Sequence, residues 1–221
     1  MGLVNMDKVI LFDLDGTIVD NTNHIMRCLK IAIQKLNIEF DNHIANNISG
    51  KSFSQISSML NLSKNEAKKL IDFYFQCDSS NINNLSLIDG MLKLLLKYHN
   101  LNFRLGIVTS KINKTTSILM DHFNLLPYFE TIITSSDVNN VKPNPEPLLL
   151  ACKKLNVLPS KNICYIGDSM SDIFASINAD LTPIGVTWGN SGSKLHDQND
   201  VKVVDNIKNL EKYLDRHYGI I

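Results

Sequence analysis

The sequence predicts an α/β protein with a doubly wound, mostly parallel, Rossmann-like sheet and an inserted all-helical domain. Three observations support this prediction. Apolar β-rich runs alternate with amphipathic stretches from residue 89 onward, residues 18–88 show helical periodicity, and 221 residues suffice for one domain with an insertion. We therefore predict an α/β core domain of residues 1–17 and 89–221, and a helical domain of residues 18–88.

The first predicted element is a buried strand at residues 9–12. Its sequence, Val9-Ile10-Leu11-Phe12, is a short apolar run that ends at the loop Asp13-Leu14-Asp15-Gly16-Thr17. A β-rich run closed by a glycine-containing loop is typical of a buried strand. Two carboxylates therefore follow the end of this strand directly.

The inserted segment is predicted to be helical because its apolar residues recur at helical spacing. The first stripe comprises Ile25, Leu29, Ala32, Ile33 and Leu36. Amphipathic stretches follow at residues 53–60 and 63–75. Ser63 followed by Glu66 matches a capping box at the start of the last stretch. No strand is expected between residues 18 and 88.

The remaining elements form a repeating rhythm of strands and helices. The predicted strands are residues 103–108, 131–134, 163–166, 183–186 and a short edge at 201–204. The predicted helices are residues 91–99, 113–123, 146–155, 172–179 and 207–217. Alternation of this kind favours a parallel sheet with helices on both faces.

Composition limits the possible partners and location. The 22 basic residues balance the 22 acidic residues, so no overall field favours a nucleic acid polymer or an anionic membrane. The start of the chain lacks the pattern of a secretory signal, and no apolar run is long enough to span a membrane. Cys28, Cys77, Cys152 and Cys164 are far apart and lack metal-ligand spacing. We therefore expect reduced thiols and a cytoplasmic protein.

Polar residues gather where the predicted strands end, which is where open parallel sheets bind their ligands. They are Asp13, Asp15, Thr109, Ser110, Lys142, Asp168 and Asp172. Four carboxylates and one ammonium leave a charge of about minus three in one cleft, which calls for a divalent cation. Ligands that offer only oxygen suit Mg²⁺. Phosphate would then be held by Thr109, Lys142 and the amides around Gly16 and Ser110.

Four segments resemble the motifs of the haloacid dehalogenase superfamily, in the same order along the chain. They are Asp13-Leu14-Asp15-Gly16-Thr17, Val108-Thr109-Ser110, Val141-Lys142-Pro143 and Gly167-Asp168-Ser169-Met170-Ser171-Asp172. The resemblance covers nearly the whole chain and includes a helical cap between the first two motifs. It is closest to the subfamily of phosphoglycolate phosphatase and pyrophosphatase-like enzymes. Each motif follows its own predicted strand, which makes the match specific.

The resemblance implies a magnesium-dependent phosphatase acting on a small phosphorylated metabolite, as a monomer or homodimer. Asp13 would be the nucleophile, forming an aspartyl-phosphate, and Asp15 the general acid and then the base. Thr109 would bind the phosphoryl oxygens and Lys142 would neutralise charge on the nucleophile and phosphate. Asp13, the Asp15 carbonyl and Asp168 would hold Mg²⁺, with Asp172 assisting or orienting Lys142.

Two alternatives remain open. A sugar phosphomutase of the same superfamily would carry a cap histidine where this chain has Ile25, with His24 one place early, and a cap arginine where it has Phe53. A non-catalytic phosphate-binding or regulatory module would keep the fold without turnover. In the cap, Lys51 is either a contact for the far end of the substrate or an ordinary solvated lysine.

Overall fold

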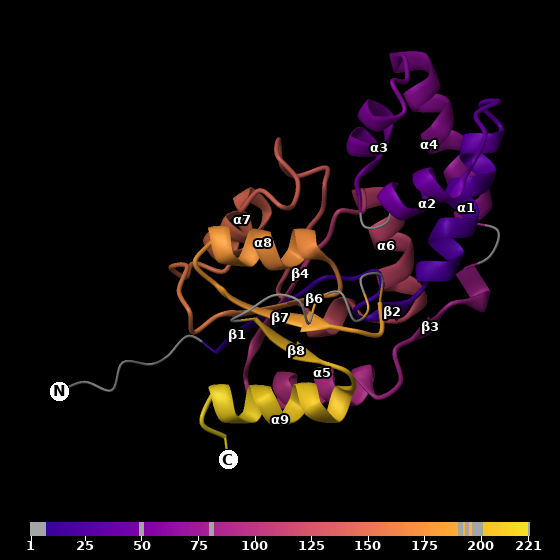
Figure 1. Ribbon diagram of the computed structural model, residues 1–221. Helices are drawn as coiled ribbons and strands as arrows, with labels where there is room; N and C mark the ends of the chain where they lie inside the picture. Colours follow the sequence, from indigo (N-terminus) through magenta and orange to yellow (C-terminus); the bar gives the residue numbers. More distant parts are fainter. Residues whose placement is uncertain are drawn as a thin grey trace. The chain divides into compact units, whose positions relative to one another are not determined.

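The computed structural model describes residues 8–48, 51–79, 82–189, 192, 195 and 201–220. The chain divides into two compact units (Figure 1). One unit comprises Met1–Asp20 and Leu87–Ile221, and the other comprises Asn21–Ser86. The first unit therefore contains all four strand-end motifs.

The first unit is built on one parallel sheet, so the predicted fold class is confirmed. Its strand order is β5-β4-β1-β6-β7-β8, and each of the neighbouring pairs is parallel. The strands are β1 (Val9–Phe12), β4 (Arg104–Val108), β5 (Thr131–Ile133), β6 (Cys164–Gly167), β7 (Thr182–Val186) and β8 (Lys202–Val204). The strands that follow β1 in the chain are added first on one side of it and then on the other, so a topological switch point lies at the carboxyl end of β1.

Helices cover both faces of this sheet. They are α5 (Met91–Asn100), α6 (Asn113–His122), α7 (Glu146–Lys154), α8 (Met170–Asn178) and α9 (Ile207–His217), with a 3₁₀ turn η2 at Leu126–Tyr128. In Figure 1, α7 and α8 lie on one side of the sheet and α5 and α9 on the other. Leu148 and Ala151 of α7 share a buried core with Val9 and Leu11 of β1. The central strands are buried on both faces, which keeps their carboxyl ends in place.

The second unit is a helical bundle with its own core. It contains α1 (Thr22–Gln34), α2 (Asn42–Ile48), α3 (Phe53–Met59), α4 (Lys64–Ser79) and the 3₁₀ turn η1 (Ile82–Asn84). The core includes Leu29, Ala32 and Ile33 of the predicted stripe. The predicted capping box is present, because Glu66 N–H donates to Ser63 Oγ at 3.3 Å and Ser63 N–H to Glu66 Oε2 at 2.9 Å.

The expectation of no strand between residues 18 and 88 is wrong at both ends of that segment. β2 (Val19–Asp20) and β3 (Ser86–Leu87) form a two-stranded sheet. Two-residue strands are too short to show the alternation by which strands are identified in a sequence.

The expectation of four reduced thiols is also wrong, because Cys28 and Cys77 form a disulfide. Cys28 lies on α1 and Cys77 on α4, and these two helices pack together. The two cysteines are 49 positions apart, and only the packing of the two helices brings them together. Their spacing in the sequence therefore does not reveal the disulfide. Cys152 and Cys164 are free and buried. Disulfides are uncommon in cytosolic proteins, so the cysteines do not support the predicted cytoplasmic location.

We expect the double variant Cys28→Ala/Cys77→Ala to be less stable than the oxidised wild type. The disulfide closes a loop spanning 49 positions, and loss of that constraint costs about 4 kcal/mol by loop-closure entropy. Urea unfolding followed by circular dichroism measures the difference. The control is the wild type with reductant, which should unfold like the variant. Unchanged wild-type stability in reductant would contradict this prediction.

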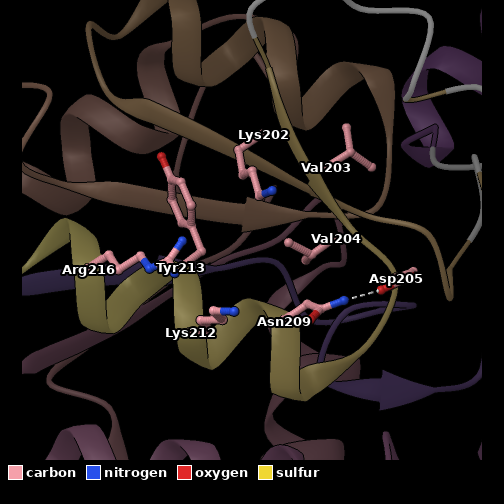
Figure 2. A pocket seen from close by; sticks show the side chains of 8 residues that line it. All are labelled: Lys202, Val203, Val204, Asp205, Asn209, Lys212, Tyr213 and Arg216. Carbon is pink, nitrogen blue, oxygen red and sulfur yellow. Dashed lines mark hydrogen bonds between the residues drawn. The ribbon is translucent and has the colours of Figure 1, made fainter. Parts of the chain in front are cut away.

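Among the described residues, no helix is long and apolar enough to cross a membrane. A pocket of about 330 Å³ lies at the outer strand β8 and helix α9 (Figure 2). It is lined by Lys202, Val203, Val204, Asp205, Asn209, Lys212, Tyr213 and Arg216. None of the predicted catalytic residues lines this pocket, so the candidate active site is best located from the strand ends.

Candidate active site

Three neighbouring strands deliver the acidic and hydroxyl groups to one edge of the sheet. Asp13 follows β1, Thr109 follows β4 and Asp168 follows β6. The hydrogen bonds of the sheet continue into two of these residues, because Asp13 N–H donates to Ile166 O at 2.8 Å and Thr109 N–H to Ile133 O at 2.9 Å. The sheet therefore holds the backbone of Asp13 and Thr109, and the side chains of all three residues are buried.

A buried lysine joins two of the predicted acids. Lys142 Nζ lies 2.8 Å from Asp13 Oδ1 and 2.6 Å from Asp172 Oδ1. Only 4% of the Lys142 side chain is exposed, so water scarcely screens these pairs. The structure thus brings together residues that lie 129 and 30 positions apart in the sequence.

The electrostatics of this cluster favour a bound cation. Burial raises the pKa of Asp13 well above its ordinary value, although Lys142 opposes this, and Asp172, Asp168 and Asp15 raise it further. For Lys142, burial disfavours the ammonium form, but the charges of Asp13 and Asp172 outweigh it and raise its pKa. A further positive charge, such as that of a bound cation, would favour the ionised form of Asp13, which is its nucleophilic form.

Asp13, Asp168 and Asp172 each offer a ligand oxygen, and these oxygens lie within 4.8 Å of one another. A buried set of carboxylates of this kind fits Mg²⁺. The three acids differ in their hydrogen bonds, however. Asp172 Oδ2 accepts from the amide and hydroxyl of Ser169 at 3.0 and 2.5 Å, while its Oδ1 accepts from Lys142. These contacts favour Asp172 as a residue that orients Lys142, and Asp13 and Asp168 as the acids that would hold a metal.

Asp15 has a partner that the strand-end reasoning does not find. Lys111 Nζ lies 3.3 Å from Asp15 Oδ1, and the Lys111 side chain is 5% exposed. Its backbone is fixed, because its N–H donates to Thr109 Oγ1 at 3.2 Å and its carbonyl accepts from Ser135 N–H at 2.9 Å. Four carboxylates and two ammonium groups leave about two negative charges, which one divalent cation would balance. In the sequence, the position of Lys111 directly after Thr109-Ser110 is the only indication that it belongs to the site.

The other predicted residues are placed less specifically. Gly16 has a positive φ of 74°, which is natural for glycine in a tight turn, and its N–H donates to Val19 O at 2.9 Å. Ser110 is half-buried beside Thr109. Lys51 is exposed and belongs to the helical unit. The phosphate-binding roles of Thr109, Ser110 and Gly16, and the substrate contact of Lys51, remain predictions.

The loop after β7 packs against the acids of the site without contributing a charged side chain. Trp188 Nε1 donates to Thr17 O at 3.2 Å. A Cβ added to Gly189 would overlap the carboxylate of Asp168 and approach Gly16 O to 2.5 Å. Only glycine allows the chain to approach Asp168 this closely. The loop after β7 therefore supports the site sterically, a contribution that sequence reasoning misses.

We expect Gly189→Ala to weaken Mg²⁺ binding by about tenfold or more, because the added methyl must displace Asp168, and disturbing groups that orient a ligand has effects of this size. Mg²⁺ titration of activity and of the melting temperature measures the loss. Gly219→Ala is the control for backbone strain alone, since φ there is 63° and an added Cβ meets no atom within 4 Å, so its Mg²⁺ midpoint should stay unchanged. An unchanged Mg²⁺ midpoint in Gly189→Ala would show that Asp168 does not depend on this close packing.

Comparisons with known proteins agree with this arrangement. Residues 10–186 match the family described as haloacid dehalogenase-like hydrolase. A pyrophosphatase from Oceanobacillus iheyensis is 26% identical over 210 residues, covering 92% of this chain and 94% of the relative. An N-acetylmuramic acid 6-phosphate phosphatase from Pseudomonas putida is 30% identical over 217 residues, covering 94% and 96%.

Among solved structures, a β-phosphoglucomutase from Clostridium difficile superposes with a TM-score of 0.80 at 25% identity, covering 96% of this chain and 97% of the other. The family match spans the first and last strand-end motifs and everything between them. The chain therefore belongs to the haloacid dehalogenase-like hydrolases.

Proposed function

We propose that this chain is a magnesium-dependent phosphatase that hydrolyses a small phosphomonoester through an aspartyl-phosphate on Asp13. The observation that carries the proposal is the buried pairing of Asp13 with Lys142 at 2.8 Å, beside the acids Asp168 and Asp172. A carboxylate held by an ammonium in a water-poor site is suited to attack phosphorus. The phosphatase names of the relatives support the same reaction.

In the first step, a carboxylate oxygen of Asp13 forms a bond to phosphorus while the bond to the leaving oxygen breaks. Asp15 donates its proton to that oxygen, so an alcohol or its equivalent departs. In the second step, Asp15 takes a proton from water, whose oxygen attacks phosphorus and releases phosphate and the Asp13 carboxylate. Lys142 offsets charge on Asp13, and Thr109 binds phosphoryl oxygens. Mg²⁺ held by Asp13 and Asp168 would offset the charge of the phosphate.

We propose that the helical segment of residues 18–88 acts as a cap that selects the substrate. Its independent core supports a separate function for this unit. Lys51 is our candidate for a contact with the far end of the substrate. The names of the relatives make pyrophosphate and a sugar 6-phosphate the first substrates to test.

The phosphomutase alternative is supported by the similarity to β-phosphoglucomutase. Two contacts within the helical unit weigh against it. Phe53, which occupies the position of the cap arginine, packs on Tyr74 with ring centroids 5.0 Å apart. His24 is half-buried and is bonded to Asp78 at 2.9 Å, so its ring is engaged within the helical unit. Both side chains are therefore engaged within the helical unit, and hydrolysis is the better-supported reaction.

Phosphate release from a panel of phosphorylated compounds with Mg²⁺ tests this proposal. The panel contains pyrophosphate, phosphoglycolate, sugar phosphates, nucleotides and an aryl phosphate. We expect release from the aryl phosphate and faster release from one metabolite. Conversion of a sugar 1-phosphate to its 6-phosphate without phosphate release would favour the mutase. No turnover of any compound would favour the non-catalytic module.

A further inference from the structure

The proposed reaction gives no role to the hydroxyl of Tyr165, which lies among the polar groups of the site. Tyr165 lies on β6, between Leu11 of β1 and Pro183 of β7 in the sheet register. It is 1% exposed, and its hydroxyl lies in the Lys142 cluster. A phenylalanine would fill nearly the same space without a polar atom, so the buried hydroxyl calls for an explanation.

The hydrogen bonds around Lys142 use all of its protons. An ammonium has three N–H donors, and Lys142 Nζ lies 2.8 Å from Asp13 Oδ1, 2.6 Å from Asp172 Oδ1 and 2.8 Å from Tyr165 OH. A fourth acceptor, Val108 O, is farther away at 3.3 Å. The best arrangement gives one proton each to Asp13, Asp172 and Tyr165.

The hydroxyl of Tyr165 also forms a hydrogen bond to the backbone of the sheet. It has one proton, and its nearest acceptor is Val108 O at 2.7 Å, with Asp172 Oδ1 at 3.0 Å. Val108 is the last residue of β4 and directly precedes Thr109. Tyr165 therefore connects the ammonium of Lys142 to the end of the strand that carries the proposed phosphate-binding threonine.

From this geometry we propose that Tyr165 is a positioning residue, whose hydroxyl holds Lys142 against the nucleophile Asp13. The inference rests on the proposed function, because it assigns Asp13 and Lys142 to catalysis. Without the hydroxyl, the third N–H of Lys142 would turn to Val108 O, which already lies within hydrogen-bond distance of Nζ at 3.3 Å. Because Val108 O lies farther from Nζ than the hydroxyl does, the ammonium would shift and its contact with Asp13 would loosen.

Replacement by phenylalanine isolates the hydroxyl. In Tyr165→Phe we expect kcat for an aryl phosphate to fall about tenfold, the scale of one hydrogen bond to a charged group, with KM within about twofold. KM should be little affected because Thr109 and the metal ligands are intact. Unchanged kcat in a folded Tyr165→Phe protein would overturn the inference.

A matched control exists elsewhere in the same unit. Tyr98 is also fully buried, and its hydroxyl donates to Asp215 Oδ1 at 2.9 Å, while Lys97 Nζ contacts the same carboxylate at 2.7 Å. Tyr98→Phe therefore removes a hydroxyl from a similar tyrosine, aspartate and lysine cluster outside the site. Its kcat should stay at the wild-type level, and its melting temperature shows how much stability such a loss costs.

A double-mutant cycle separates positioning from a general structural effect. If the hydroxyl acts through Lys142, Tyr165→Phe should lower kcat in the wild type but cause little further loss in Lys142→Met. An equal loss in both backgrounds would contradict the inference. Should Tyr165→Phe fail to fold, 3-fluorotyrosine at position 165 keeps the hydroxyl but weakens it as an acceptor, and kcat should again fall. An inactive wild type would instead refute the proposed function itself.

Discussion

Replacing Asp13 by Asn is expected to abolish turnover of every phosphomonoester that the wild type hydrolyses. The amide is nearly isosteric but is a poor nucleophile, so kcat should fall by at least about 10⁴-fold, as for other enzymes that lose a covalent nucleophile. Phosphate release under saturating substrate and Mg²⁺ measures the loss. The protein should remain folded, since the substitution preserves the volume of a side chain that is only 8% exposed.

Asp121→Asn provides a matched control on the exposed surface of α6. It makes the same chemical change and should leave kcat unchanged. Circular dichroism on both variants separates loss of chemistry from loss of fold. Substantial turnover in a folded Asp13→Asn protein would show that phosphorus is attacked by another group.

Removal of divalent metal is expected to reduce activity to the background rate, and Mg²⁺ to restore it. Without a cation, burial and the neighbouring acids raise the pKa of Asp13 and so disfavour its ionised form, although Lys142 opposes this. Chelator treatment followed by Mg²⁺ titration measures this effect. A ligand that binds only the folded state also stabilises it, so Mg²⁺ should raise the melting temperature of the wild type.

Asp168→Asn tests where that metal binds. It removes one carboxylate charge while preserving shape, so we expect both the Mg²⁺ activation and the Mg²⁺-dependent rise in melting temperature to weaken together. The variant for comparison is Asp172→Asn, because the Asp172 carboxylate accepts hydrogen bonds from Lys142, Ser169 and Tyr165. It should lower kcat and change the Mg²⁺ midpoint much less. Equal midpoints in Asp168→Asn and the wild type would exclude Asp168 as a ligand.

The positions of the main polar groups follow from the sequence because they depend on the topology of the sheet. Asp13, Thr109 and Asp168 each come directly after an apolar run, and the carboxyl ends of neighbouring parallel strands meet at one edge. The predicted helix starts at residues 91, 113, 146 and 207 agree with the structure, and the start predicted at residue 172 is wrong. α8 begins at Met170 and not at residue 172, because Ser169 caps it and Asp172 completes the capping box.

Other parts of the site depend on packing that no linear pattern shows. Tyr165 is an ordinary aromatic residue within a strand, and only the register of β6 brings its hydroxyl beside Lys142. The need for glycine at position 189 comes from the approach of one loop to Asp168. The disulfide likewise depends on the packing of α1 against α4. Each is a three-dimensional contact between segments whose local sequences are unremarkable.

The most direct test of the account is to trap the proposed phosphoenzyme in Asp15→Asn. An aryl phosphate has a good leaving group and needs little acid assistance, so the first step should proceed, while the second lacks its base and should stall. We expect a burst of one aryl alcohol per enzyme, and peptide mass spectrometry after acid quench should locate the phosphoryl group on Asp13. A burst with the phosphoryl group on another residue, or steady turnover with no modified Asp13, would contradict the account.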